Sequence, residues 1–346
     1  MTDSLEVDTL EFAGSPGSPY SMKMLAYMRY RRIPYAFHIV PHGALKGYPT
    51  PRPVLFPTFF FKNEAGELEA KVDSTPIIRK LETEHEGRAA LPENPALRFL
   101  HDLIEDYADE WMTKIMFHYR WADAGNAEYV APMLMYWRDT RVDADAADEG
   151  ASMFASRQIE RLKYVGSNEV TAETIEASYL RVLDILDRVI AKQAYLFGSK
   201  PTAADFAVYG QMSQIAMIEP SSAKICQDKA PRIRCWLDHV ADASGISADC
   251  DGWEVFETST QTLRPFFEEI GRTYAPLVLA NGKAAKAGKT SFETEIDGRR
   301  WMQDVFPYHV KCLMALRKSF AELPAESQTQ VRGVLQGTGC DVFMGS

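Results

Sequence analysis

The tetrapeptide Ser18-Pro19-Tyr20-Ser21 places three hydroxyl groups at the start of a predicted helix. Proline is favoured at the first position of a helix, so Ser18 is the predicted N-cap residue. An N-cap serine normally accepts a hydrogen bond from its own helix. Its hydroxyl group can also donate to an anion beside the partial positive charge of the helix N-terminus. Ser18 is therefore the first candidate for stabilising an anionic reactant, with Ser15, Tyr20 and Ser21 as alternatives.

A second cluster of interest is the aromatic and methionine-rich stretch Ile104–Trp121. An aromatic, Met-rich wall suits an apolar or aromatic small molecule. A place in the hydrophobic core is the more common role for any single residue of this kind. The large apolar side chains of this stretch are Tyr107, Trp111, Met112, Met116, Phe117, Tyr119 and Trp121.

The same stretch also contains carboxylates and a histidine, which raises the question of a metal site. Glu105 and Asp109 are four residues apart and His118 lies nine residues further, so the three do not share one face of a helix well. We expect a solvated or helix-pairing face for Glu105, Asp109 and Glu110, and no metal ion. The five cysteines show no CxxC spacing and none precedes Cys226, so neither a disulfide framework nor a zinc site is predicted.

The elements that must position these residues change in type along the chain. In the first 90 or so residues we predict the order strand, helix, strand, long loop, hairpin and helix. The helix at Tyr20–Arg32 follows a Gly/Ser/Pro turn, and the hairpin has NEAG as its turn. The predicted ranges are strand 10–13, helix 20–32, strand 35–40, loop 42–53, strands 58–62 and 67–72, and helix 75–84.

Helices dominate from residue 94 to about residue 243. Thr202 and Asp205 form a capping-box arrangement that opens one of them. We expect an acidic loop at Asp139–Gly150. In the last 100 residues we predict a hairpin around Asp297-Gly298, an amphipathic helix at Gln303–Leu323, and an exposed loop at Asn281–Thr290.

Composition narrows the class of protein. The chain has 346 residues and a net charge of -10, which argues against a nucleic-acid partner and against polybasic membrane attachment. The longest apolar run is too short to cross a membrane. The acidic first residues lack the apolar segment of a secretory signal, so we expect a cytoplasmic protein.

Four motifs in order resemble the cytosolic glutathione S-transferase (GST) superfamily. They are GSPYSMKML (17–25), Phe56-Pro57 before the FFF strand, Asp73-Ser74 before TPIIRKLE, and Thr202–Asp205 with the following FAVYG. The match covers about residues 8–240. The first motif resembles the serine-type turn of tau- and omega-like members, although the cysteine of the omega-like form is absent. The resemblance implies a thioredoxin-like α/β domain at 1–88 and an all-helical domain at 89–245. Residues 246–346 are then an unusual, mostly helical extension, too aromatic to remain solvated and packed on the helical domain.

The resemblance also implies roles for individual residues. Phe56, ahead of a cis Pro57, would pair through its backbone with the main chain of glutathione; Arg52-Pro53 is a competing position for this motif. Asp73 and Ser74 would hold the ammonium and carboxylate groups of the γ-glutamyl end, a role compatible with simple helix capping. Ser18 would face the thiolate. The second substrate would lie against Tyr20, Tyr107, Trp111 and Phe117.

Two functions follow from this resemblance. The first is a glutathione transferase that activates the glutathione thiolate for attack on an apolar or aromatic electrophile, with no metal and with a homodimer as the implied assembly. The alternative is a non-catalytic ligand-binding or interaction protein with the same fold. The phenylalanine before Pro57, the Pro-rich loop and the long extension favour the alternative.

Overall fold

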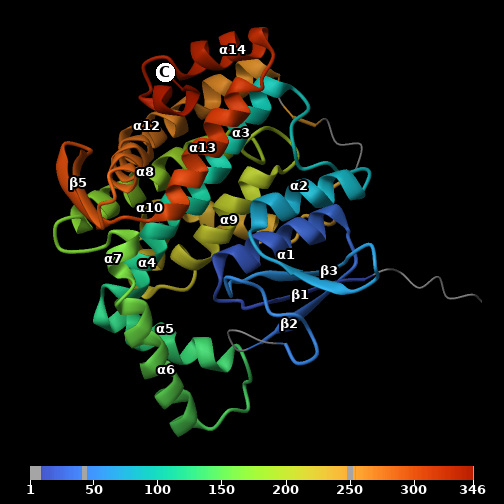
Figure 1. Ribbon diagram of the computed structural model, residues 1–346, viewed down its shortest axis with the longest axis vertical. Coiled ribbons are helices and arrows are strands. Elements are labelled where there is room, and N and C mark those ends of the chain that lie inside the picture. The colour runs from blue at the N-terminus through green and yellow to red at the C-terminus, as the bar shows by residue number, and fades with distance from the viewer. Residues whose placement is uncertain (1–8, 41–44, 248–251, 254, 346) are drawn as a thin grey trace, which may run out of the picture.

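The computed structural model describes residues 9–40, 45–247, 252–253 and 255–345. The first eight residues and part of the loop predicted at 42–53 therefore lie outside the described residues. Figure 1 shows a small sheet flanked by helices on one side of the molecule and a larger helical region on the other. Among the described residues, no helix is long and apolar enough to cross a membrane.

The N-terminal part is the predicted α/β unit. Its sheet has the order β2-β1-β3-β4, with β1 parallel to β2 and antiparallel to β3. Phe12 and Phe59 are fully buried at the centre of this sheet, and their rings stack with centroids 4.4 Å apart. The elements are β1 (Leu10–Gly14), α1 (Pro19–Arg31), β2 (Tyr35–Ile39), β3 (Thr58–Lys62), β4 (Leu68–Lys71) and α2 (Ser74–Glu84).

The helical part begins with a long helix that contains a π-helical turn, η1 (Ala108–Met112), between α3 and α4. Helix α9 is buried over its whole length and packs directly on α1. Gly210 permits this approach, because a Cβ atom there would lie 2.5 Å from the Pro19 carbonyl oxygen. The helices are α3 (Pro95–Tyr107), α4 (Thr113–Trp121), α5 (Ala124–Tyr136), α6 (Ala144–Ile159), α7 (Leu162–Val165), α8 (Ala172–Ile190), α9 (Ala203–Ile215), α10 (Pro220–Lys229) and α11 (Pro231–Ala241).

The C-terminal extension packs on the helical part, where α12 lies against α8 and α3, and α13 and α14 lie against α3 (Figure 1). Buried residues of all three parts form one continuous hydrophobic cluster. The extension therefore shares a core with the rest of the molecule. Its elements are α12 (Phe256–Lys286), β5 (Ser291–Ile296), β6 (Arg299–Asp304), α13 (Pro307–Ala321), α14 (Ala325–Leu335) and the short 3-10 helix η2 (Cys340–Met344).

Three local predictions are wrong. The acidic loop expected at Asp139–Gly150 is helical from residue 144, because Asp143 caps the alanine-rich stretch that follows. The loop expected at Asn281–Thr290 continues α12 as far as Lys286, and Asn281 is buried. Residues 303 and 304 belong to β6 instead of the next helix, which begins at Pro307. The predicted hairpin around Asp297-Gly298 is confirmed.

Candidate active site

Strand register brings three of the predicted motifs to one edge of the sheet. Ala13 pairs with Thr58 in the β1–β3 ladder, and Phe59 pairs with Lys71 in the β3–β4 ladder. The residues after β1, before β3 and after β4 therefore lie at the same edge. These residues are the turn that ends at Ser18, the Phe56-Pro57 pair and the Asp73-Ser74 pair. Helices α1 and α2 both begin there, so two helix N-termini supply partial positive charge to this edge.

The two candidate X-Pro bonds adopt the same isomer. The Phe56–Pro57 peptide bond is cis, as predicted, and so is Arg52–Pro53. Only Pro57 is followed at once by a strand, β3. Its position beside the end of β1 makes Phe56 the better candidate for backbone pairing with a ligand.

Ser18 is the N-cap of α1, as predicted. Its Oγ accepts a hydrogen bond from the Ser21 backbone N–H at 3.3 Å. Within the described residues, no hydrogen bond uses the Ser18 hydroxyl as a donor, so its proton is free to serve a ligand. The capping interaction and a donor role are therefore compatible.

Two of the three alternatives to Ser18, namely Ser21 and Tyr20, are more committed within the protein. The buried Ser21 Oγ accepts from the Ser15 backbone N–H at 3.2 Å, and Ser15 Oγ accepts from the Gly17 N–H. The Tyr20 hydroxyl group donates to the Asp109 carbonyl oxygen at 2.8 Å. Burial, with Glu110 and Asp109 nearby, raises the pKa of Tyr20 well above its usual value, so this phenol stays protonated. Ser18 and Ser15 are thus equally available as hydroxyl donors, and Ser18 is favoured because it is the N-cap at the start of α1.

The helical part clamps the turn that presents Ser18. Arg120 of α4 donates from Nη1 to the Gly17 carbonyl oxygen at 2.8 Å and from Nη2 to Gln214 Oε1 at 2.7 Å. Gln214 in turn donates to the Pro16 carbonyl oxygen at 3.2 Å. The Arg120 guanidinium also pairs with the buried Glu219 at 2.5 Å. Side chains of the helical part thus hold the backbone of the turn in place.

The end of α5 covers the same turn. A Cβ atom at Gly17 would lie 2.4 Å from Leu134 Cδ2 and 2.8 Å from Trp137 Cζ3. Leu134 is buried and Trp137 is half-buried. The apolar wall next to Ser18 therefore comes from α5. The sequence analysis did not identify these two residues, although the apolar run Met133–Trp137 was available as a signal.

Two of the predicted substrate-binding aromatic residues lie elsewhere. Tyr107 and Trp111 are fully buried. The Trp111 indole N–H donates to Ser178 Oγ at 2.8 Å, and its ring contacts Trp301 of the extension with centroids 5.4 Å apart. Both rings are part of the packed core between the helical part and the extension. Phe117 is half-buried and contacts two hydrophobic clusters.

Asp73 adopts an unusual backbone conformation at the start of α2. Its φ of 81° lies in the left-handed region, which costs energy for a residue other than glycine. Its side chain makes no capping hydrogen bond with α2. Instead, Asp73 Oδ2 accepts a hydrogen bond from the Tyr308 hydroxyl group of α13 at 2.6 Å. The next residue, Ser74, is buried and begins the helix.

Behind this edge lies a buried ionic network that joins α1 to the long helix. Lys23 Nζ lies 2.9 Å from Glu105 Oε1 and 2.6 Å from Asp109 Oδ2. The carboxylates of Glu105 and Asp109 therefore pair two helices, which was one of the two expectations for them. They are buried, so the other expectation, a solvated face, is wrong. Burial tends to raise the pKa of Glu105, but Arg79 and Lys23 outweigh it and hold the pKa well below its usual value. For Asp109 burial prevails over Lys23 and raises the pKa to about 7.

A second set of buried ionisable side chains connects α3 and η1 with the extension. Glu110 Oε2 lies 3.2 Å from His309 Nε2, and the Tyr274 hydroxyl group donates to Asp106 Oδ2 at 2.6 Å. Burial, with Glu110 nearby, raises the pKa of Asp106 to about 8. The pKa of Glu110 is raised by burial to about 7, with a further contribution from the Asp73 charge. Burial lowers the pKa of Lys114 to about 7.

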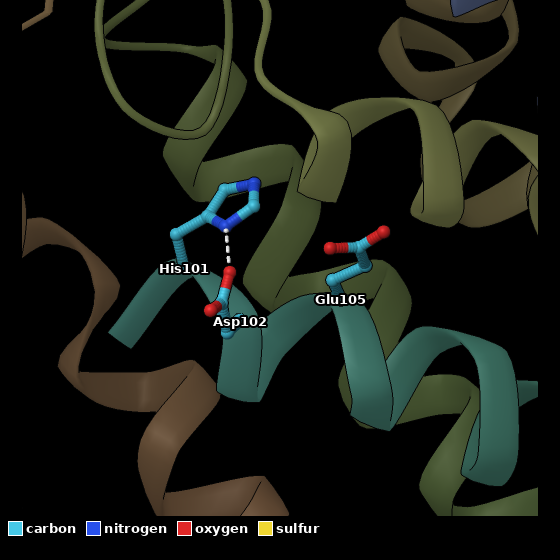
Figure 2. Close-up of side chains that lie close together, drawn as sticks. All are labelled: His101, Asp102 and Glu105. Atoms are coloured by element: carbon cyan, nitrogen blue, oxygen red, sulfur yellow. Dashed lines mark hydrogen bonds and ion pairs between the residues drawn. The ribbon is translucent and has the colours of Figure 1, made fainter. Parts of the chain in front are cut away.

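One cluster in the described residues has the composition of a metal site, namely His101, Asp102 and Glu105 of α3 (Figure 2). His101 Nε2 accepts the backbone N–H of Ala204, so Nδ1 carries the proton and donates to Asp102 Oδ1 at 2.8 Å. Arg79 bridges Asp102 and Glu105 at 2.8 and 2.5 Å. Every side chain of the cluster is already paired, which fits a structural network that fastens α3 to α2 and α9. The separate His118 contacts Ser167 and Glu176.

Comparisons with known proteins agree with this architecture. The family model described as the glutathione S-transferase N-terminal domain matches residues 12–89, and the one described as the C-terminal domain matches residues 158–239. A comparison with curated proteins finds no match.

Several solved structures are similar to this chain at low sequence identity. A GST-like protein from Pseudomonas syringae is 16% identical, with 67% of this chain and 66% of that chain covered and a TM-score of 0.40. A glutathione transferase family member from Pseudomonas fluorescens Pf-5, with two glutathione bound, is 13% identical over 68% and 89%, with a TM-score of 0.42. A glutathione S-transferase from Rhodospirillum rubrum F11 is 14% identical over 69% and 90%, with a TM-score of 0.41. This chain spans just under two thirds of the length of the first of these proteins.

Proposed function

Because this chain belongs to the glutathione transferase superfamily, we propose that it binds glutathione at the edge of the sheet and activates the thiol group. The observation that carries this proposal is the strand register. It places the Ser18 turn, the Phe56-Pro57 pair and the Asp73-Ser74 pair at one edge, beside two helix N-termini. An anionic tripeptide with a carboxylate at each end suits such an edge.

Each residue then has a role in binding. Backbone groups of Phe56 pair with the main chain of the tripeptide. The Ser74 hydroxyl and backbone N–H bind the γ-glutamyl carboxylate at the start of α2, and the Asp73 carboxylate faces the ammonium group. Ser18 donates to the sulfur at the start of α1. A free thiol has a pKa of about 8.5, and each unit by which the site lowers it is about 1.4 kcal/mol of thiolate stabilisation.

The second substrate in this proposal is an apolar or aromatic electrophile. Its wall is formed by Leu134 and Trp137 of α5, with Phe117 and the ring of Tyr20 as further candidates. Leu134 and Trp137 are favoured because they lie directly over the Ser18 turn. The thiolate attacks the electrophilic carbon, a thioether bond forms, and the leaving group departs with the bonding electrons.

One observation favours the alternative, a non-catalytic ligand-binding protein of the same fold. Ser18 already accepts a hydrogen bond from Ser21, as a purely structural cap would. The two functions differ in whether the bound thiol becomes more acidic.

The test is calorimetric titration of glutathione, followed by conjugation of a reactive aromatic halide, with wild type, S18A and S15A. We expect wild type to bind glutathione and to conjugate it, S18A to bind it with conjugation lowered about tenfold to a hundredfold, and S15A to resemble wild type. If wild type does not bind glutathione at millimolar concentration, it is neither a glutathione transferase nor a glutathione-binding protein. Binding without conjugation supports the alternative, and unchanged conjugation by S18A rejects Ser18 as the donor.

Three finer predictions accompany this proposal, namely a cytoplasmic location, a homodimer and the absence of a metal cofactor. Light scattering after size-exclusion chromatography tests the dimer. Metal analysis of the purified protein tests the last.

A further inference from the structure

The extension contacts the candidate glutathione site through the side chain of Tyr308. The Tyr308 hydroxyl group lies 2.6 Å from Asp73 Oδ2, although the two residues are 235 positions apart in sequence. Tyr308 is 37% exposed, so its ring borders solvent at the same edge as Asp73. Asp73 belongs to one of the four family-like motifs, whereas Tyr308 lies in the extension, beyond all of them.

The backbone that carries Tyr308 is firmly held. Asn281 of α12 is fully buried and donates from Nδ2 to the Phe306 carbonyl oxygen at 3.0 Å. Its Oδ1 accepts the Phe306 backbone N–H at 2.8 Å. The Val305 N–H donates to the Thr290 carbonyl oxygen at 2.8 Å. The start of α13 is therefore a fixed platform, which gives the Tyr308 hydroxyl group a defined position.

Asp73 has a neutral hydrogen-bond donor at Oδ2 and another carboxylate, Glu110, in its surroundings. Burial is the main cause of the raised pKa of Glu110, and the negative charge of Asp73 contributes further. Glu110 Oε2 lies 3.2 Å from His309 Nε2. The Tyr308 hydroxyl group donates a hydrogen bond but brings no charge to the site. A carboxylate accepts about four hydrogen bonds over its two oxygens, so one donor at Oδ2 leaves Oδ1 available.

We propose that Tyr308 is a positioning residue of the glutathione site, which holds the Asp73 carboxylate so that Oδ1 receives the γ-glutamyl ammonium group. This inference rests on the proposed function. The extension thereby completes the γ-glutamyl end of the site from within the same chain. The Asp73 side chain makes no capping hydrogen bond with α2, so its carboxylate is available to partners outside that helix.

The experiment compares two ligands by calorimetric titration of the full chain. Glutathione carries the ammonium group, and glutaryl-cysteinylglycine lacks it but keeps the rest of the tripeptide. The variants are Y308F, which removes only the hydroxyl group, and Y164F as a matched control at an exposed tyrosine of α7. We expect Y308F to raise the Kd for glutathione about tenfold, equivalent to about 1.4 kcal/mol, and the Kd for the analogue less than about twofold. Y164F should change neither.

A second arm repeats the glutathione titration in a D73N background. Because Tyr308 acts through Asp73, the effect of Y308F should largely disappear there. An equal loss for both ligands, or a loss that persists in D73N, assigns Tyr308 a merely structural role and overturns the inference. Tighter binding by Y308F shows an inhibitory contact and also overturns it. If wild type binds glutathione and Y308F has the same Kd, this inference alone is refuted. If wild type does not bind glutathione, the proposed function is refuted and the inference with it.

Discussion

The buried ion pair between Arg120 and Glu219 supports the turn that presents Ser18, and its removal should be costly. The two side chains are 4% and 0% exposed. Replacing Arg120 with methionine keeps much of the volume but leaves the Glu219 carboxylate buried without its cation. Breaking a buried pair in this way costs about 3–5 kcal/mol. The Gly17 carbonyl oxygen and Gln214 Oε1 also lose their donors.

Urea unfolding followed by circular dichroism measures the effect. We expect R120M to lower the free energy of unfolding by about 3–5 kcal/mol. The double variant R120M/E219Q removes the stranded charge, so it should recover part of the loss and fall about 1–3 kcal/mol below wild type because of the unsatisfied backbone carbonyl. R141M is the control, since Arg141 is 87% exposed in its pair with Asp139 and should change stability by less than about 1 kcal/mol.

The same variants should also lose activity. Release of the Gly17 carbonyl oxygen frees the turn, so both R120M and R120M/E219Q should conjugate glutathione more slowly than wild type under conditions where they are folded. A loss of stability in R120M no larger than in R141M would refute the burial argument. A double variant less stable than R120M would refute the claim that the stranded charge dominates.

Three further predictions concern packing and protonation. G210A should lower the free energy of unfolding by about 1–3 kcal/mol, because its Cβ atom would overlap the α1 backbone. G333A, at a helical position with open space, should leave it unchanged or raise it by up to about 1 kcal/mol. Equal effects of the two variants in thermal or urea unfolding would contradict the close approach of α9 to α1. The raised pKa of Asp106 means that the folded protein keeps a proton that the unfolded chain releases above about pH 4. This group therefore lowers the free energy of unfolding as pH rises from about 4 to about 8, and D106N should lose this contribution while Asp109 and Glu110 keep theirs. Parallel curves of stability against pH for wild type and D106N would contradict it. W301A should lower the free energy of unfolding by about 3–5 kcal/mol, because the fully buried Trp301 packs the extension into the common core. The variant should still unfold in one transition by fluorescence and circular dichroism. An early transition of the extension alone would show that the core is not shared.

Local sequence signals were sufficient for much of the fold. The β1–α1–β2 and β3–β4–α2 order follows from alternating apolar residues, from Pro19 at a helix start and from the NEAG turn, and the structure has these elements within one or two residues. The stretches 139–150 and 281–290 were mistaken for loops because their composition is acidic or small and polar. Asp143 caps the first as a helix, and tertiary contacts of Asn281 with Phe306 stabilise the second.

The candidate site was less accessible to sequence reasoning. Ser18, Phe56 and Asp73 each stand next to a helix or strand end, where local patterns are informative. Trp137 and Tyr308 come from elements that are distant in sequence, and only the packing of α5 and α13 brings them to this edge. The burial of Tyr107 and Trp111 likewise depends on the extension, whose position over α3 no local pattern encodes.

The contact between Asp73 and Tyr308 also has a consequence for protein synthesis. During translation, residue 308 is added 235 residues after residue 73, which at about 5–20 residues per second is a delay of roughly 10–50 seconds. Throughout that interval the nascent N-terminal domain carries Asp73 without the tyrosine that holds its carboxylate. A chain that ends before the start of α13 would therefore lack Tyr308, and its Asp73 carboxylate would lose the hydrogen bond that Tyr308 donates.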